Sequence, residues 1–353
     1  MNQLLTILFA TITSFGLTFF AIPSIINVCI NKKLYDTPCS RKNHKNPTPS
    51  MGGLAIFAGY VFAVTFWSEQ DQIKELQYII ASTLIIFFMG LKDDLMDISP
   101  FKKILGQVFS SLIVIFFAKI QLTSLYGVFG IYHISYFVGV VSSLLIILAI
   151  TNSFNLIDGI DGLAATIASG ALAFYGYWFF SIELYQYSIL SFSLVGSLLA
   201  FLYYNRSPAK IFMGDTGSLL VGLIIALLSV KFIEVNRIVS SSSNYKIFSG
   251  PVIAITILII PLFDTTQVFV RRIWQGKSPF KADRLHLHHL LQELNLTSRT
   301  VCLSLLSTTL SLILISFFLK NLSPELNLVI IFTICTIALA FLIKIKKTRQ
   351  KIA

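Results

Sequence analysis

The chain has 353 residues, of which 55% are hydrophobic and only 12% are charged, and its mean hydropathy is +0.80. These values exclude a soluble globular domain, in which about 25% of residues are charged, and they are typical of a protein that crosses a membrane several times. The net charge of +11 does not require a nucleic-acid partner, because the cytoplasmic loops of membrane proteins are enriched in Lys and Arg.

Apolar runs long enough to cross a bilayer recur along the whole chain. A transmembrane helix needs roughly 17 to 25 mainly apolar residues, so these runs predict an all-α polytopic membrane protein, with residues 1–353 forming one membrane domain. We expect eleven transmembrane helices, at about 4–30, 51–67, 78–91, 104–118, 134–151, 163–181, 186–204, 217–233, 251–270, 301–319 and 325–343. The first run lacks the basic start and the cleavage site of a signal peptide, so it is predicted to remain as an anchor.

The distribution of charge predicts how the chain is oriented. With the N-terminus outside and the C-terminus in the cytoplasm, 21 of the 27 Lys and Arg residues lie on the inner side. Nine of the ten Asp and four of the five His also lie there, whereas five of the six Glu lie outside. We therefore expect the active site in the cytoplasmic loops, which are predicted at about 31–50, 92–103, 152–162, 205–218 and 271–300.

The densest group of acids lies in the motif LKDDLMD, residues 91–97. Asp93, Asp94 and Asp97 directly follow an apolar run, and three carboxylates this close repel one another unless a cation is present. A divalent metal would relieve the repulsion. The alternative is a solvated helix end that carries acids by chance.

Two Asp-Gly dipeptides end the fifth predicted span, in the motif NSFNLIDGIDGLA. Asp158 and Asp161 are three residues apart, so they lie on the same side of a turn if the segment is helix-like. Together with Asn155 they are costly in lipid, and we expect them to line a cleft or the aqueous surface. A purely structural role is the alternative.

A third motif, IFMGDTGS, precedes the eighth span and carries Asp215 between two glycines. A glycine-containing turn leaves backbone amides free, which suits either a metal ligand or an acid beside a metal-bridged phosphate. A helix N-cap formed by Asp215 or Thr216 is the competing interpretation.

Two further inner loops are basic. In the last one, DRLHLHH, His286 and His289 share a helix face if the segment is helical, and no HExxH pattern or Cys partner points to zinc, so the basic surroundings favour phosphate contact or proton transfer. In the first one, Pro47 and Pro49 stiffen a loop that leads to Gly52-Gly53, a pair that allows close backbone approach. This loop could hold a phosphorylated ligand, or it could serve only to orient the chain.

The four motifs, in this order, resemble those of the polyprenyl-phosphate N-acetylhexosamine-1-phosphate transferases, of the glycosyltransferase 4 type and related to phospho-N-acetylmuramoyl-pentapeptide transferase. The resemblance covers roughly residues 37–290. It implies an enzyme of the bacterial inner membrane that moves a sugar-1-phosphate from a UDP-sugar to undecaprenyl phosphate, releases UMP and uses Mg²⁺ or Mn²⁺. The order His286-Leu287-His288-His289 looks like the N-acetylglucosamine-1-phosphate branch and departs from the three consecutive histidines of the muropeptide branch.

The resemblance also implies roles for individual residues. Asp93 and Asp94 match the first acidic pair of the family and Asp215 matches its metal-ligating acid, so these three are the predicted catalytic and metal-binding residues. The predicted substrate-binding residues are Lys45, Asn155, Asp158, Asp161, Phe212, Arg284, His286, His288 and His289. Among these, Lys45 and Phe212 look like the uridine-contacting lysine and the stacking aromatic residue. The lipid bilayer is the other expected partner, while a homodimer and the role of Asp97 are left open.

Two rival functions would also place acids near a membrane. A cation-coupled transporter is expected to carry acids at the centres of its spans, whereas here they gather at one face. A prenyl-diphosphate-type membrane transferase would use an acidic DDxxD motif with Mg²⁺, but it would ordinarily need a second such motif and would leave the Asp-Gly pair and the histidines without a role. The sequence does not choose among the UDP-sugars, or between direct transfer and a covalent intermediate.

Overall fold

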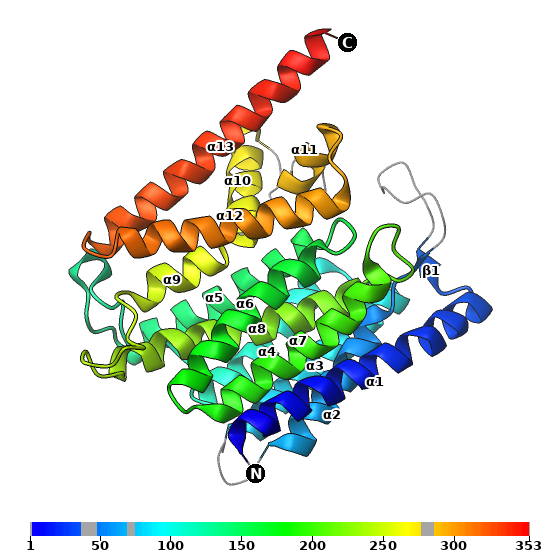
Figure 1. Cartoon of the computed structure of the whole chain (residues 1–353), viewed down its shortest axis with the longest axis horizontal. Helices are drawn as coiled ribbons and strands as arrows, with labels where there is room; N and C mark the ends of the chain where they lie inside the picture. The colour runs from blue at the N-terminus through cyan, green and yellow to red at the C-terminus, as the bar shows by residue number, and fades with distance from the viewer. Residues whose placement is uncertain (1, 37–47, 69–74, 277–285, 353) are drawn as a thin grey trace.

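The computed structural model describes residues 2–36, 48–68, 75–276 and 286–352 (Figure 1). These residues are mostly helical, with one short antiparallel pairing between β1 (Tyr35–Asp36) and β2 (Thr48–Pro49). The α-helices are α1 (Gln3–Lys32), α2 (Gly52–Trp67), α3 (Leu76–Leu95), α4 (Pro100–Phe116), α5 (Tyr136–Ile157), α6 (Leu163–Ser181), α7 (Tyr185–Asn205), α8 (Gly214–Ile238), α9 (Gly250–Ile257), α10 (Ile259–Trp274), α11 (Leu287–Glu293), α12 (Ser298–Phe318) and α13 (Pro324–Ile352).

The helices confirm a polytopic membrane protein. Among the described residues, eight helices are long and apolar enough to cross a membrane, and the bent pair α9 and α10 would make nine. Every one of the eleven predicted spans coincides with a helix or with this pair. However, α2 has 16 residues and α4 has 17, which is at or below the shortest length that crosses a bilayer core. The count of eleven therefore stays a prediction.

The predicted span 251–270 is broken by a bend of 77° between α9 and α10. Pro261 explains the break, because a proline inside a helix lacks the N–H for the backbone hydrogen bond and its ring clashes with the carbonyl four residues earlier. That carbonyl belongs to Ile257, which is the last residue of α9. As a result, α10 leaves the direction of the bundle and stands across it, as Figure 1 shows.

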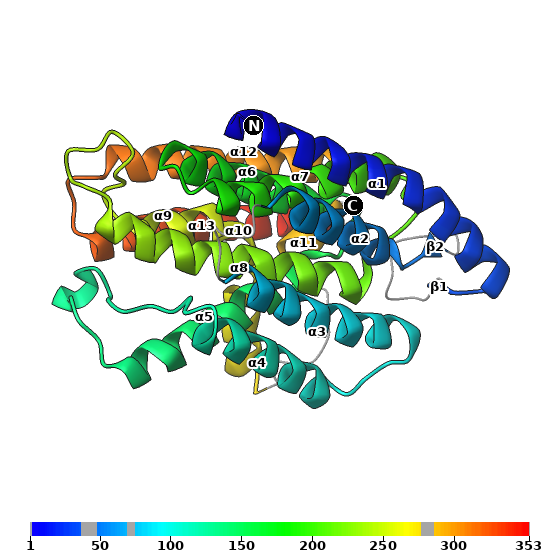
Figure 2. The same cartoon turned by 90° about the horizontal axis from the view of Figure 1, so that it is seen from below.

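Helix α8 is the central element of the bundle (Figure 2). In its most apolar stretch 83% of the residues are buried, compared with 11% in α13, and α8 packs against α2, α3, α5, α6, α7 and α9. A Cβ added to Gly53 would lie 2.2 Å from the backbone nitrogen of Gly217, and one added to Gly90 would lie 2.6 Å from the Cα of Thr216. Glycines thus bring α2 and α3 against the first turn of α8, which confirms the close approach predicted at Gly52-Gly53.

Several helix ends meet at the start of α8. Helix α3 ends at Leu95, and α4 begins at Pro100, where the missing N–H costs nothing because the first turn of a helix leaves this group unpaired. Helix α8 begins at Gly214, which has φ +70°, and a Cβ there would lie 2.2 Å from the carbonyl oxygen of Ser50. Only glycine fits both conditions. The turn that precedes Asp215 is therefore fixed by the backbone of two neighbouring segments.

Candidate active site

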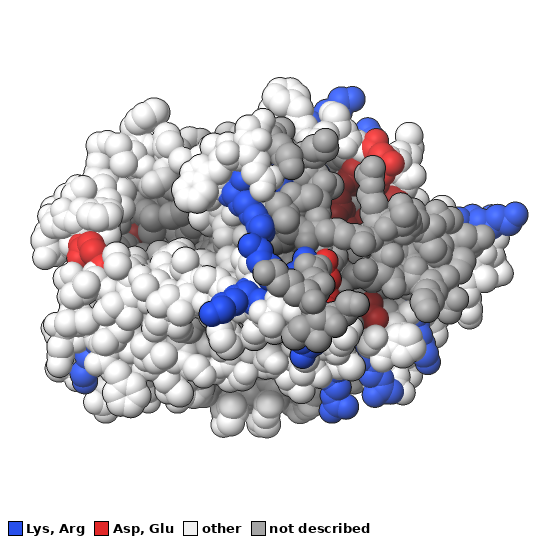
Figure 3. Space-filling model, turned by 90° about the horizontal axis from the view of Figure 1, so that it is seen from above, with Lys and Arg blue, Asp and Glu red and all other residues white. Residues whose placement is uncertain are grey.

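A polar cavity of about 630 Å³ opens where these helix ends meet. Its acidic lining residues are Asp93, Asp94, Asp97, Asp158, Asp161 and Asp215, and its other lining residues include Asn155, Phe212 and His289. On the face that Figure 3 shows, acidic side chains gather toward one end of the molecule beside several basic ones. The structure therefore brings together eight of the predicted site residues, along with Asp97.

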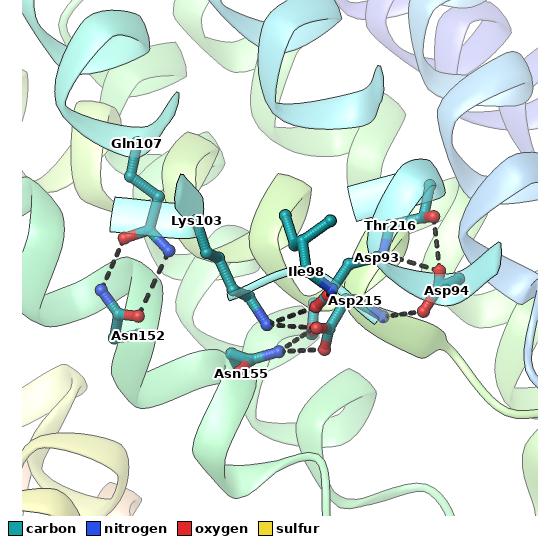
Figure 4. A network of polar contacts seen from close by, with 10 residues as sticks. Asp93, Asp94, Ile98, Lys103, Gln107, Asn152, Asn155, Asp215 and Thr216 are labelled. Atoms are coloured by element: carbon teal, nitrogen blue, oxygen red, sulfur yellow. Dashed lines mark hydrogen bonds and ion pairs between the residues drawn. The ribbon is translucent and has the colours of Figure 1, made fainter. Parts of the chain in front are cut away.

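Lys103, near the start of α4, contacts two members of this acidic group. Its Nζ donates to Asp93 Oδ2 at 2.9 Å and also contacts Asp215 Oδ2 (Figure 4). From the other side, Asn155 Nδ2 donates to Asp215 Oδ1 at 2.6 Å and to Ser218 Oγ at 2.9 Å. The carboxylate of Asp215 is thus held between α4 and α5.

The charge of Lys103 is maintained by its neighbours. Burial alone would lower the pKa of its ammonium group, but the carboxylates of Asp215 and Asp93 outweigh this effect and raise the pKa above its ordinary value. Lys103 is therefore protonated at neutral pH. Sequence reasoning counted Lys103 only as a marker of orientation. Its position in the same short loop as Asp93 was the signal that could have identified it.

The adjacent acids Asp93 and Asp94 have different hydrogen-bond partners. Asp94 Oδ1 accepts a hydrogen bond from the backbone N–H of Asp215 at 2.7 Å, and its Oδ2 accepts from the backbone N–H of Thr216 at 2.9 Å and from the Thr216 hydroxyl at 2.5 Å. These amides form the start of α8, where unpaired N–H groups and the helix dipole favour a negative charge. The carboxylate that caps α8 thus comes from α3, and neither Asp215 nor Thr216 caps its own helix as the competing interpretation expected.

This geometry limits how a divalent ion could be held. Within the described part of the chain, no group of three or more His, Cys, Asp or Glu side chains is arranged to hold a metal ion. Asp93 and Asp215 both face one ammonium group, whereas both oxygens of Asp94 are occupied by α8. Mg²⁺ is commonly bound by one or two carboxylates together with substrate phosphates and water. The pair Asp93 and Asp215 fits such an ion, and Asp94 is better suited to positioning Asp215.

The Asp-Gly motif forms the opposite wall of the cavity. Asp161 Oδ2 accepts a hydrogen bond from the backbone N–H of Ala209 at 3.2 Å, so the motif is tied to the loop before α8. Burial and then the charges of Asp215, Asp94 and Asp161 raise the pKa of Asp158 to about 7. Near neutral pH, Asp158 therefore exists in both protonation states and can donate or accept a hydrogen bond.

The three histidines do not share one environment. His286 Nδ1 lies 2.9 Å from Asp264 Oδ2, and Asp264, which is only 2% exposed, also accepts from the backbone N–H of Leu287 at 2.7 Å. This contact ties α11 to α10. Sequence reasoning did not connect Asp264 with His286.

His288 is buried behind the Asp-Gly motif. A Cβ added to Gly159 would lie 2.3 Å from His288 Nε2, and neither ring nitrogen has a hydrogen-bond partner among the described residues. Burial first, and then the neighbouring His289, lower the pKa of His288 to about 3, so its ring is neutral near physiological pH. Only His289 of the three lines the cavity. Two other predicted binding residues, Lys45 and Arg284, lie outside the described residues.

Comparison with known proteins identifies the family. The sequence profile described as glycosyl transferase family 4 matches residues 76–233. The chain is 33% identical over 339 residues to a probable undecaprenyl-phosphate N-acetylglucosaminyl 1-phosphate transferase of Bacillus subtilis (strain 168), covering 94% of this chain and 90% of that protein. It is 29% identical over 322 residues to the undecaprenyl-phosphate alpha-N-acetylglucosaminyl 1-phosphate transferase of Escherichia coli (strain K12), covering 88% of this chain and 84% of the relative. The chain therefore belongs to glycosyl transferase family 4.

Proposed function

We propose that this enzyme transfers N-acetylglucosamine-1-phosphate, or the 1-phosphate of a related N-acetylhexosamine, from a UDP-sugar to undecaprenyl phosphate and releases UMP. The names of its relatives support the lipid acceptor and the sugar. The observation that carries the proposal is the pair Asp93 and Asp215, which lines a polar cavity of about 630 Å³ and contacts the ammonium of Lys103. A cavity of this volume is in the range of pockets that hold small-molecule substrates.

The reaction brings together two phosphate-bearing substrates that repel each other. An oxygen of the lipid phosphate attacks the β-phosphorus of the UDP-sugar, and the bond from this phosphorus to the bridging oxygen breaks, so that the electron pair leaves with UMP. Asp93 and Asp215 both contact the ammonium of Lys103, which offsets their negative charge. Asn155 holds Asp215 in place from the side of α5. Mg²⁺ or Mn²⁺, held by Asp215 and Asp93, would screen the phosphates and stabilise the leaving group.

The remaining lining residues suit the sugar nucleotide. Phe212 provides an aromatic face for the uracil base, while Asp158 and Asp161 offer hydrogen-bonding groups on the opposite wall. His289 lies in the same cavity and is assigned to the phosphates or the sugar. Lys45 keeps its predicted contact with uridine, and Arg284 keeps its predicted role of holding the phosphates or the sugar.

The lipid chain is assigned to apolar surface beside the bend in the bundle. A second pocket of about 260 Å³ is lined by apolar residues of α5, α8, α9 and the segment before α5, among them Ile146 and Ile233, and by Leu258 at the bend between α9 and α10. Leu262, which also lines it, lies in the first turn of α10. An apolar pocket within the membrane suits part of a polyprenyl chain, whose phosphate would extend toward the polar cavity.

We further propose that the enzyme lies in the bacterial inner membrane with its active site facing the cytoplasm, as one membrane domain. This orientation is supported by the 21 of 27 Lys and Arg residues assigned to the inner side. In this arrangement α2 and α4 also cross the membrane and give eleven spans, with the N-terminus outside. UDP-sugars are found in the cytosol, so in this orientation the polar cavity would open to the compartment that contains the donor substrate.

The proposal can be tested with the purified protein in detergent. It is incubated with undecaprenyl phosphate, Mg²⁺ and either UDP-N-acetylglucosamine, another UDP-N-acetylhexosamine or UDP-glucose, and UMP and lipid-linked product are both quantified. We expect one lipid diphosphate sugar per UMP with an N-acetylhexosamine donor, no UMP without the lipid, and no turnover after chelation of divalent ions. If no UDP-N-acetylhexosamine yields UMP, the proposal is contradicted. UMP formed without lipid would indicate a hydrolase instead.

A further inference from the structure

Two amide side chains join α4 to α5 just beyond the catalytic residues. Asn152 Nδ2 donates to Gln107 Oε1 at 2.6 Å, and Gln107 Nε2 donates back to Asn152 Oδ1 at 3.2 Å (Figure 4). Asn152 Nδ2 also donates to the carbonyl oxygen of Leu148 at 2.8 Å. Gln107 is 1% exposed, so this reciprocal pair, which we call the amide clamp, lies inside the bundle. Such groups are costly among apolar helices unless they are paired with each other.

The position of the amide clamp along the two helices connects it to the site. Gln107 follows Lys103 by four residues, so the two side chains lie on the same face of α4 about one turn apart. Asn152 precedes Asn155 by three residues and shares a face of α5 with it in the same way. Lys103 and Asn155 are the residues that contact Asp215 from opposite sides. The clamp therefore joins the two helices one turn away from the two side chains that hold Asp215.

Helix α4 needs such a directional contact because it lies at the edge of the bundle. Its outward face carries Phe101, Leu105 and Phe109, which are all more than half exposed and suit contact with lipid. Apolar packing gives little preference for one helix register over another when lipid is as apolar as the protein, whereas hydrogen bonds between helices do. Toward α3, α4 is held by the hydrogen bond from Ser110 Oγ to the carbonyl oxygen of Ser82 at 3.0 Å. Toward α5, the amide clamp supplies the corresponding contact.

From these contacts we infer that Gln107 and Asn152 are positioning residues. They fix the register of α4 against α5 and thereby aim Lys103 and Asn155 at Asp215. Neither side chain lines the cavity, so neither touches the substrates. This inference rests on the proposed function, because it assigns the clamp a role in the transfer step.

The test uses single substitutions and an exchange of the two residues. Gln107→Leu and Asn152→Leu each remove one amide and leave the other without its partner, while the double substitution Gln107→Asn with Asn152→Gln keeps an amide pair of the same total length. We expect each single variant to lower kcat for UMP release by about 10-fold or more, because a displacement of about 1 Å at a catalytic group costs up to about 100-fold. The KM for the UDP-sugar is expected to change by less than about twofold, since the nucleotide-contacting residues are untouched.

The matched control is a second amide contact far from the cavity. Asn327 of α13 is fully buried, donates to the carbonyl oxygen of Ser316 in α12 at 3.1 Å and accepts from the Ser316 hydroxyl at 3.1 Å. Asn327→Leu should lower the thermal unfolding temperature about as much as the clamp variants but leave kcat unchanged. The exchanged pair should recover both the unfolding temperature and most of the lost kcat.

Three results would overturn the inference. They are an unchanged kcat in Gln107→Leu, an equal loss of kcat in Asn327→Leu, and an exchanged pair no better than the single variants. Failure of the proposed function gives a different pattern, because the unaltered protein would then release no UMP at all. In that case the unfolding temperatures still decide whether the amide pair joins α4 to α5, since the exchanged pair must unfold at a higher temperature than either single variant.

Discussion

The two ends of α8 carry the same kind of group in different surroundings. At its start, Asp215 contacts Lys103 and Asn155. At its other end, Glu234 accepts hydrogen bonds from the backbone N–H of Thr123 at 2.7 Å and from its hydroxyl at 2.8 Å, and it also contacts the hydroxyl of Tyr126. Both carboxylates have good partners, so hydrogen bonding by itself does not tell a functional acid from a structural one.

What separates the two ends is the balance of charge around an open cavity. Around Asp215, five further aspartates line a polar cavity beside the ammonium of Lys103. The partners of Glu234 instead hold the segment before α5 onto the bundle, and the neighbouring pocket is apolar. Clustered carboxylates that face a cavity indicate a site for a cation and for phosphates, whereas a carboxylate saturated by one loop indicates a structural contact. The variants below test this distinction.

The largest effect is expected from Asp215→Asn, which removes the charge at the start of α8 and keeps the shape of the side chain. The rate of UMP release should fall by about 10³-fold or more, near the upper end of what one preorganised electrostatic group contributes. The matched control at the other end, Glu234→Gln, should retain at least about half of the activity because it changes only a loop contact. Comparable losses in the two variants, measured in membranes with equal protein content, would contradict the distinction.

The next largest effect is expected from Lys103→Met, which keeps the length of the side chain and removes its charge. UMP release should fall by about 10²-fold, since Asp93 and Asp215 would then repel each other and the substrate phosphates. The adjacent Lys102 is exposed, so Lys102→Met serves as the control and should be nearly as active as the unaltered protein. Because the pKa of Lys103 is raised, its charge persists as the pH rises, and the activity of the unaltered protein should not fall between pH 7 and pH 9 through loss of this proton. Equal activity of the two variants would remove Lys103 from the site.

A smaller effect is expected from Gly159→Ala. The new Cβ would lie 2.3 Å from His288 Nε2, so the Asp-Gly motif must shift and the KM for the UDP-sugar should rise by about 10-fold. Gly16→Ala in α1 is the control, because a Cβ there meets no atom within 4 Å. Combining Gly159→Ala with His288→Ala should lower the KM again, because the second change removes the ring that obstructs the first. If the double variant binds no better than Gly159→Ala, the collision with His288 is not the cause.

The smallest effect is expected where α13 meets α11. Lys346 Nζ lies 2.5 Å from Glu293 Oε2, and Arg349 donates to the carbonyl oxygen of Leu294 at 2.9 Å, so the end of α13 supports the helix that carries His289. The ion pair is partly exposed, and pairs of this kind contribute about 0 to 1 kcal/mol. Lys346→Met should therefore lower the unfolding temperature by only a few degrees and change UMP release by less than about twofold. A larger loss of activity would show that this support is part of the site.

The sequence could predict the helices and the gathering of the acids at one end of them, because both follow from composition along the chain. It could not predict which groups pair. Lys103 and Asp215 are 112 residues apart, and Asp94 and Thr216 are 122 apart, so these contacts exist only once the ends of α3, α4 and α8 converge. Neighbours as similar as Asp93 and Asp94 are distinguished only by the direction in which α3 presents each of them.

The same limit applies to His286, whose partner Asp264 lies 22 residues earlier, in α10. The sequence also did not predict the bend between α9 and α10. Pro261 is apolar, so it does not interrupt the apolar run from which one continuous span was predicted. The sequence could therefore predict which types of residue form the site. The contacts that each of these residues makes, and hence its individual role, depend on how the helix ends pack.

The capping of α8 by Asp94 has an electrostatic consequence for the substrates. Six aspartates line the cavity, yet the carboxylate of Asp94 faces the positive end of the α8 dipole, which is equivalent to roughly half an elementary charge. Asp93 and Asp215 share the ammonium of Lys103, and Asp158, with its pKa raised to about 7, is only partly ionised at neutral pH. Groups of the protein thus compensate much of the negative potential in the cavity. This compensation lowers the electrostatic repulsion that an incoming nucleotide diphosphate meets at the entrance.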